Sequence, residues 1–212
     1  SMNRSEATND PSSTSKDNHT ADVDIQITTL TPELFPEARI VENAVIGHNK
    51  GCCFGLLLYS WCPTQQSDFD AIYLKDVTRR ETYGVAISSD RTSDGSNKVV
   101  GICKGRRHDQ EANFDENMMY KPKEGEFYID ALSVLAETRG KGVGTKLLQW
   151  AEEVAREKGD TKLVLGVMEG NPAERLYTRF GFVEVERDPC CVGFWIGRPH
   201  GSCVGIEMVK GI

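Results

Sequence analysis

The sequence has no long apolar run, and none of its stretches approaches the roughly 18 residues that a membrane-spanning helix needs. Its first residues also lack the apolar core of a secretory signal peptide. Positive charge is not in excess, since 25 Lys and Arg face 32 Asp and Glu, for a formal net charge of −7. So acidic a chain is a poor match for nucleic acid or an anionic membrane as its main partner. These absences predict a cytoplasmic protein, with a nuclear location left open.

The sequence also lacks an even set of cysteines, since its seven cysteines are scattered along the chain. Without a secretory signal, such cysteines are expected to be free thiols in a reducing compartment. Cys190, Cys191, His200 and Cys203 lie near one another in the sequence, but their spacing fits no common zinc pattern. We therefore expect no metal site.

Large apolar residues are nearly absent from residues 1–22, which consist mainly of Ser, Thr, Asn and Asp. This composition predicts a disordered N-terminal tail, and Ser1-Met2 is interpreted as an expression scar. The remaining residues, 23–212, are enough for one sizeable core, and we expect them to form a single domain.

Hydrophobic periodicity and turn residues predict a chain of alternating strands and helices. We expect strands at 23–29, 82–88, 98–105, 126–135, 162–168, 183–187 and 204–210, and helices after Thr31, from about 143 to 158, and over 171–182. The apolar run at 52–61 is ambiguous between helix and strand and is assigned to a helix. The polar residues 106–125 are assigned to a long mobile loop, in which Arg106-Arg107 form a charged face. This order predicts a mixed α/β sheet with one parallel crossover.

A run of alternating glycines, Gly140, Gly142 and Gly144, stands directly before the amphipathic helix near residue 143. The free N–H groups and the dipole of a helix start favour a phosphate there, and Arg139 and Lys141 add positive charge. The spacing fits neither the Walker pattern nor the dinucleotide fingerprint. On the glycines alone, a capped helix with basic surface residues is an equal alternative.

Two segments resemble the GNAT superfamily of acetyl-CoA-dependent N-acyltransferases. "LSVLAETRGKGVGTKLL" matches the family's cofactor-binding segment at Val134, Arg139, Gly142 and Gly144. "NPAERLYTRFGF" matches the second segment at Asn171, Leu176, Tyr177, Gly181 and Phe182, although its alanine, Ala173, comes one residue early. The resemblance implies a GNAT-like fold: a mixed, mostly antiparallel central sheet with a splayed parallel strand pair and flanking helices.

The resemblance also implies acetyl-CoA as cosubstrate. Backbone groups of the splayed strand at Leu132, Ser133 and Val134 would bind the pantetheine arm, and the N–H of Val134 would polarise the thioester carbonyl. Asn171 would contact the cofactor arm. The pyrophosphate would be cradled by the loop and helix start, residues Arg139, Gly140, Lys141, Gly142, Val143, Gly144 and Thr145.

Transfer to an amine needs a proton acceptor for the amine and a proton donor for the departing thiolate. The family often places a tyrosine at the position of Tyr177 as the donor; otherwise this residue is an aromatic anchor of its helix. Asp130, which is predicted to share a face with Leu132 in an apolar strand, is the first candidate base, or else a structural aspartate satisfied by amides. Glu126 on the same face is the second candidate. Relatives that act on protein N-termini carry Glu at the position of Gly166, which counts against that substrate class here.

We therefore expect an N-acetyltransferase that transfers the acetyl group directly to a primary amine of a small molecule or a protein. The alternative from another class is a non-catalytic acyl-CoA-binding or regulatory module on the same fold; a third is an enzyme that uses a longer acyl-CoA. The expected partners are acetyl-CoA and the amine, with no nucleic acid or membrane, and the protein is expected to be a monomer or homodimer. Residues 43–80 and 186–204 are expected to form the acceptor walls.

Overall fold

The computed structural model describes residues 24–46, 66–91, 97–112, 116–117, 120–188 and 204–212. Several predictions fall outside these ranges: the tail at 1–22, the helix at 52–61, and the group Cys190, Cys191, His200 and Cys203. Within the described ranges, no helix is long and apolar enough to cross a membrane.

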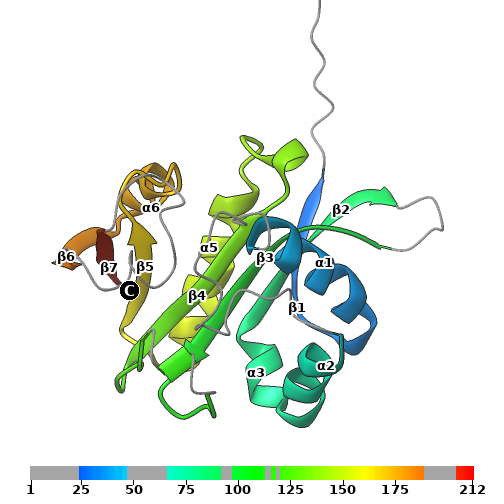
Figure 1. Cartoon of the computed structure of the whole chain (residues 1–212), viewed down its shortest axis with the longest axis horizontal. Helices are drawn as coiled ribbons and strands as arrows, with labels where there is room; N and C mark the ends of the chain where they lie inside the picture. Colours follow the sequence, from blue (N-terminus) through cyan, green and yellow to red (C-terminus); the bar gives the residue numbers. More distant parts are fainter. Residues whose placement is uncertain (1–23, 47–65, 92–96, 113–115, 118–119, 189–203) are drawn as a thin grey trace, which may run out of the picture.

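A seven-stranded sheet forms the centre of the molecule (Figure 1). Its strands are β1 (Ile25–Thr29), β2 (Tyr83–Arg91), β3 (Asn97–Arg107), β4 (Glu126–Val134), β5 (Lys162–Met168), β6 (Val183–Asp188) and β7 (Gly205–Gly211). They lie side by side in the order β1-β2-β3-β4-β5-β7-β6. Each neighbouring pair is antiparallel except β4 and β5, which are parallel. The predicted mixed, mostly antiparallel sheet with one parallel pair is confirmed.

Helices cover both faces of this sheet, and each face has its own apolar core. On one face lies α5 (Val143–Glu157), joined to β4 through the short helix η3 (Ala136–Thr138), with α6 (Glu174–Phe180) beside it. On the other face, in front in Figure 1, lie α1 (Phe35–Ile46), α2 (Gln66–Lys75) and α3 (Val77–Glu81), preceded by η1 (Pro32–Leu34). Alternate strand residues enter opposite cores, as Ile102 and Cys103 do.

The helix predicted after the glycine run is present with nearly the expected bounds. Leu147, Leu148 and Ala151 recur at helical spacing and are completely buried against the sheet, which is the pattern of a helix with one apolar face. The predicted stop is also confirmed, because Gly159 follows the helix with a φ of +80°, a conformation that glycine adopts without strain.

The assignment of Arg106 and Arg107 to a charged loop face is wrong. Both belong to β3, and the Arg106 side chain is only 1% exposed. Its Nη2 donates to the carbonyl oxygens of Glu116 and Tyr120 at 2.9 and 2.7 Å, and its guanidinium pairs with a carboxylate of β4. A buried cation needs such a partner, and the sequence alone does not show which strand supplies it.

Candidate active site

The parallel strands β4 and β5 pair over only part of their length. Their ladder runs from Glu126 and Lys162 to Ile129 and Leu165, and then ends. Beyond that point β4 stays paired with β3, and β5 stays paired with β7. The two strands part at their carboxyl ends, as their arrows do in Figure 1, so their facing edges carry backbone groups that do not pair with each other.

The direction of the backbone hydrogen bonds shows which β4 residues point toward this opening. The N–H of Leu135 donates to the carbonyl of Val100 on β3 at 2.9 Å. Because direction alternates along an antiparallel strand, the backbone of Ser133 also faces β3, whereas that of Leu132 and Val134 faces the opening. Of the three predicted pantetheine-binding residues, Leu132 and Val134 therefore direct their backbone groups to the opening and Ser133 does not, and the binding itself stays a prediction.

The loop after β4 has the conformation that its glycines allow. Gly140 and Gly142 adopt φ values of +78° and +79°, and Gly142 precedes α5 without a side-chain cap. The first-turn N–H groups of α5 thus donate to no side chain at the N-cap position. Arg139 and Lys141 are exposed, and the Nε of Arg139 donates to the Val134 carbonyl at 3.0 Å, which ties the loop to the end of β4.

Gly144 has a different role from the other two glycines. A Cβ at this position would lie 2.9 Å from Cδ2 of Leu176 on α6, a distance that real Cβ contacts do not reach. Gly144 therefore allows α5 and α6 to approach each other, and Leu176 belongs to the second family-like segment.

Asn171 lies in the turn between β5 and α6. Its Oδ1 accepts a hydrogen bond from the N–H of Ala173 at 2.9 Å, the arrangement of an Asx turn at a helix start. The structure thus assigns its side-chain oxygen to a local contact, and the predicted contact with the cofactor arm stays a prediction.

Tyr177 is 7% exposed and packs edge-on against Phe182, with ring centroids 5.9 Å apart. No described residue forms a hydrogen bond with its hydroxyl that the structure records. Burial and, to a smaller extent, neighbouring Cys103 raise the pKa of Tyr177. Cys103 stands opposite Leu132 in the β3–β4 register, so the tyrosine lies near the opening. Its packing is that of an aromatic anchor, and its role as a proton donor stays a prediction.

Asp130 does not share a face with Leu132, which corrects the prediction. Gly105 pairs with Ile129 and Lys104 with Ala131, so Asp130 is an extra residue in β4. Such a β-bulge reverses the alternation that follows it. Leu132 consequently packs in the core beneath α5, and Ala131 packs in the core beneath α1 and α2.

The carboxylate of Asp130 is engaged in a two-point ion pair with the buried Arg106. The Nε–Oδ2 and Nη2–Oδ1 distances are 3.1 and 3.2 Å. A guanidinium, and not backbone amides, therefore satisfies this aspartate. Both of its oxygens are occupied, which weakens the case for Asp130 as the base, although its role stays a prediction.

Glu126 lies at the paired start of β4, before the opening. It accepts hydrogen bonds from the Tyr120 hydroxyl at 2.9 Å and the Lys123 N–H at 2.8 Å, and pairs with Lys162 at 3.0 Å. Burial raises the pKa of Glu126, but these three partners outweigh burial and lower it. A carboxylate so stabilised is a weak proton acceptor.

Two residues that sequence reasoning missed lie on the same face as Asp130. Tyr128 stands between the two candidate bases in β4, and Glu207 is a single carboxylate within the apolar strand β7. The signal that drew attention to Asp130, a carboxylate inside an apolar strand, was present at Glu207 too. The sequence does not show that Glu207 pairs with Gly166 on β5. This pairing brings Glu207 to the opening.

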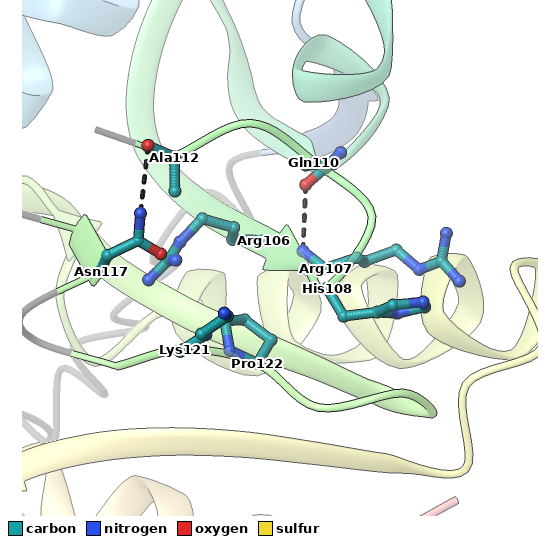
Figure 2. Close-up of a pocket in the computed structure, with 8 residues that line it drawn as sticks. All are labelled: Arg106, Arg107, His108, Gln110, Ala112, Asn117, Lys121 and Pro122. Atoms are coloured by element: carbon teal, nitrogen blue, oxygen red, sulfur yellow. Dashed lines mark hydrogen bonds between the residues drawn. The ribbon is translucent and has the colours of Figure 1, made fainter. Parts of the chain in front are cut away.

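A pocket of about 340 Å³ lies at the end of β3. Figure 2 shows the residues that line it: Arg106, Arg107, His108, Gln110, Ala112, Asn117, Lys121 and Pro122. None of them is a predicted site residue. Its two guanidinium groups are already paired with Asp130 and Asp160.

Comparison with known structures supports the fold. A GCN5-related N-acetyltransferase from Kribbella flavida superimposes with a TM-score of 0.61 at 17% identity, over 89% of this chain and 98% of that one. A ribosomal-protein-alanine N-acetyltransferase from Brucella melitensis gives 0.59 at 19%, over 88% and 99%. Naa50 of Arabidopsis thaliana, in complex with the bisubstrate analogue CoA-Ac-MVNAL, gives 0.57 at 18%, over 89% and 99%.

A sequence comparison with curated proteins finds no match. Residues 54–182, however, match the model of the acetyltransferase (GNAT) family. This range is more than half of the chain and contains β4, the glycine loop, α5, β5 and α6. The chain therefore belongs to the acetyltransferase (GNAT) family, and it is an acyltransferase with acetyl-CoA as its acetyl donor.

Proposed function

We propose that this protein is an N-acetyltransferase that passes the acetyl group of acetyl-CoA directly to a primary amine. The observation that carries the proposal is the parting of β4 and β5 after the Ile129–Leu165 pair. In this proposal the backbone of Leu132 and Val134, the uncapped start of α5 and the hydroxyl of Tyr177 surround the opening that the two strands leave.

Each of these groups has a role in acetyl transfer. The N–H groups of Leu132 and Val134 hydrogen-bond along the pantetheine arm and polarise the thioester carbonyl. The free N–H groups at the start of α5 bind the pyrophosphate. Tyr177 donates a hydrogen bond to the sulfur as the C–S bond breaks, and no covalent intermediate with the protein is required.

The acceptor is expected to arrive as an ammonium ion, because carboxylates lie near the opening on the face of the sheet opposite α5, and that of Glu207 has no ion pair among the described residues. Glu126, Asp130 and Glu207 lie on that face, and Glu186 of β6 is beside Glu207. That Naa50 of Arabidopsis was solved with a peptide-containing bisubstrate analogue supports including peptides among the amines to test.

The proposal is tested with a panel of amines and acetyl-CoA, with release of free thiol and the mass of the product as readouts. The panel contains polyamines, amino acids, aminoglycosides, lysine peptides and peptide N-termini, with an acceptor-free reaction as control. We expect thiol release that depends on at least one amine and a product heavier by one acetyl group. Tight acetyl-CoA binding without turnover on any amine would instead favour the non-catalytic module, and faster turnover with a longer acyl-CoA would change the donor.

A further inference from the structure

An empty side-chain position lies on β5 where the strand begins to part from β4. Gly166 is the first β5 residue after the last pair, Ile129–Leu165. A Cβ at Gly166 would point toward the hydroxyl of Tyr128, 3.5 Å away. Gly166 also pairs with Glu207 across the β5–β7 ladder, and side chains of such a pair project from the same face about 5 Å apart. Tyr128 and Glu207 thus border the same small space.

Tyr128 is fixed with its hydroxyl directed into this space. The residue is 7% exposed, and its ring stacks on that of Tyr120 with centroids 4.3 Å apart and planes at 15°. The guanidinium carbon of Arg106 lies 5.6 Å from the same ring centroid. Among the described residues, none forms a recorded hydrogen bond with the Tyr128 hydroxyl. A phenol whose ring is held in place by its neighbours is ready to accept or donate one hydrogen bond at its oxygen.

Glu207 differs from the other carboxylates of this face because the described residues offer it no ion pair. The charged groups around it are Glu186 of β6, Lys162 of β5, Glu126 of β4 and Lys123. Lys162 is already paired with Glu126. Burial first, and then the like charge of Glu186, raise the pKa of Glu207 above its ordinary value. A carboxylate in this state accepts a proton more readily than a paired one does.

We propose that Glu207 and the Tyr128 hydroxyl bind the acceptor ammonium group in the space over Gly166, and that Glu207 is the base that takes its proton. The inference rests on the proposed N-acetyltransferase function. One proton passes from R–NH3⁺ to the Glu207 carboxylate, and the freed amine forms the C–N bond at the acetyl carbon. The C–S bond breaks with its electron pair on sulfur. The second nitrogen proton reaches the sulfur through Tyr177 or water, and Glu207 returns its proton to solvent.

Four variants test this inference with the best acceptor from the amine panel. Glu207→Gln removes the base and keeps the shape of the side chain, and Tyr128→Phe removes only the hydroxyl. Gly166→Val fills the space at a strand position whose φ is ordinary. Glu153→Gln is the matched control, because it makes the same change of charge on an exposed residue of α5, on the other face of the sheet. Steady-state kinetics across pH, acetyl-CoA affinity and melting temperature are measured for each.

We expect Glu207→Gln to lower kcat/KM for the amine by about 100-fold near neutral pH, the usual contribution of a positioned base. Acetyl-CoA affinity and melting temperature should stay close to those of the wild type. The wild-type loss of activity toward low pH, as Glu207 becomes protonated, should disappear in Glu207→Gln. Tyr128→Phe and Gly166→Val should raise KM for the amine more than they lower kcat. Glu153→Gln should keep both the activity and the pH profile of the wild type.

A folded Glu207→Gln protein with kcat/KM within about twofold of the wild type and an unchanged pH profile would overturn the inference and leave the proposed function standing. If Glu207→Gln is unstable, Glu207→Asp and Gly166→Val test the inference in its place. Full activity in Gly166→Val would show that the acceptor does not use the space over Gly166. Absence of wild-type turnover on every amine would overturn both the proposed function and the role of Glu207.

Discussion

Three carboxylates on the face of the sheet opposite α5 differ in what surrounds each of them. Asp130 is bound at both oxygens by a guanidinium, and Glu126 is bound by an ammonium, a hydroxyl and a backbone N–H. Glu207 has no such partner among the described residues, and its pKa is raised. Since a base must have a free oxygen and an appreciable proton affinity, the local chemistry favours Glu207 over the two candidates found from sequence.

Tyr177→Phe is predicted to lower turnover by about ten- to a thousand-fold, because removing one preorganised donor to a developing charge usually costs that much. The ring stays against Phe182, so melting temperature and acetyl-CoA affinity should hardly change. Thiol release under conditions where chemistry limits the rate is the measurement. Near-full turnover there would make Tyr177 an anchor alone, with water or another side chain as the donor.

Asp130→Ala is predicted to destabilise the fold by about 3–5 kcal/mol, because it leaves the charge of Arg106 buried without its carboxylate. Asp109→Ala is the matched control, since Asp109 is 52% exposed in its pair with Arg107 and such pairs contribute about 0–1 kcal/mol. Denaturant unfolding measures both. Turnover per folded Asp130→Ala molecule should stay within severalfold of the wild type. A stable variant that has lost turnover would instead identify Asp130 as the base.

At the scale of elements, the glycine run before α5 divides into two functions. Gly140 and Gly142 provide positive φ values in the exposed loop, where an added Cβ would contact nothing within 4 Å. Gly144 is inside the helix and has an ordinary φ, but it faces Leu176 of α6. The first two glycines therefore serve the loop that is proposed to bind pyrophosphate, and the third serves helix packing.

Paired substitutions to valine should separate these functions. Gly142→Val places a β-branched residue at a left-handed position, at a cost of about 1–2 kcal/mol, and hinders the approach of a phosphate to the backbone. We expect this substitution mainly to weaken acetyl-CoA binding, by at least tenfold in the dissociation constant measured by calorimetry. Gly144→Val pushes α6 away and should mainly lower the melting temperature. The opposite pattern, with affinity lost in Gly144→Val and kept in Gly142→Val, would contradict this assignment.

Elements with strong local signals could be predicted from the sequence, whereas features set by pairing could not. The α5 periodicity, the Gly159 stop and the apolar run of β5 gave correct assignments because each depends on neighbouring residues. The bulge at Asp130 depends on the β3 register, so its effect on which side chains share a face was not visible. The same holds for Arg106 and Glu207, whose partners come from other strands. Helices α2 and α3 were missed, since Phe69 of α2 packs against Phe35 and Tyr83, which are distant in the sequence.

At the scale of the whole molecule, a buried charge network joins parts distant in sequence. Glu116 pairs with Arg79 of α3 at 2.6 Å and with Lys104 of β3 at 2.9 Å. Arg79 is 3% exposed and Glu116 is 11% exposed. Arg106 reaches the same segment through the carbonyl oxygen of Glu116. This network connects α3, β3 and β4 on the face opposite α5, so its state of charge should influence the stability of the entire fold.

The network predicts a loss of stability in acid that depends on Glu116. Burial alone would raise the pKa of Glu116, but Arg79 and Lys104 outweigh it and hold the pKa well below the ordinary value of 4.5. A group with a lowered folded pKa stabilises the protein above its unfolded pKa, and this contribution disappears as pH falls through the folded value. When urea unfolding is measured from about pH 7 to about pH 2.5, the free energy of unfolding of the wild type should therefore decline steeply below pH 4.5.

Glu116→Gln should lose about 3–5 kcal/mol near neutral pH, because it leaves two buried cations without their shared carboxylate. The difference between this variant and the wild type should shrink steadily in acid, as protonation gives the wild type the same neutral side chain. Glu184→Gln is the control. Arg187 also lowers the pKa of Glu184, but this pair is at the surface, so the variant should show the same dependence of unfolding free energy on pH as the wild type. Parallel curves for the wild type and Glu116→Gln over the whole pH range would show that the acid sensitivity of the fold comes from other carboxylates.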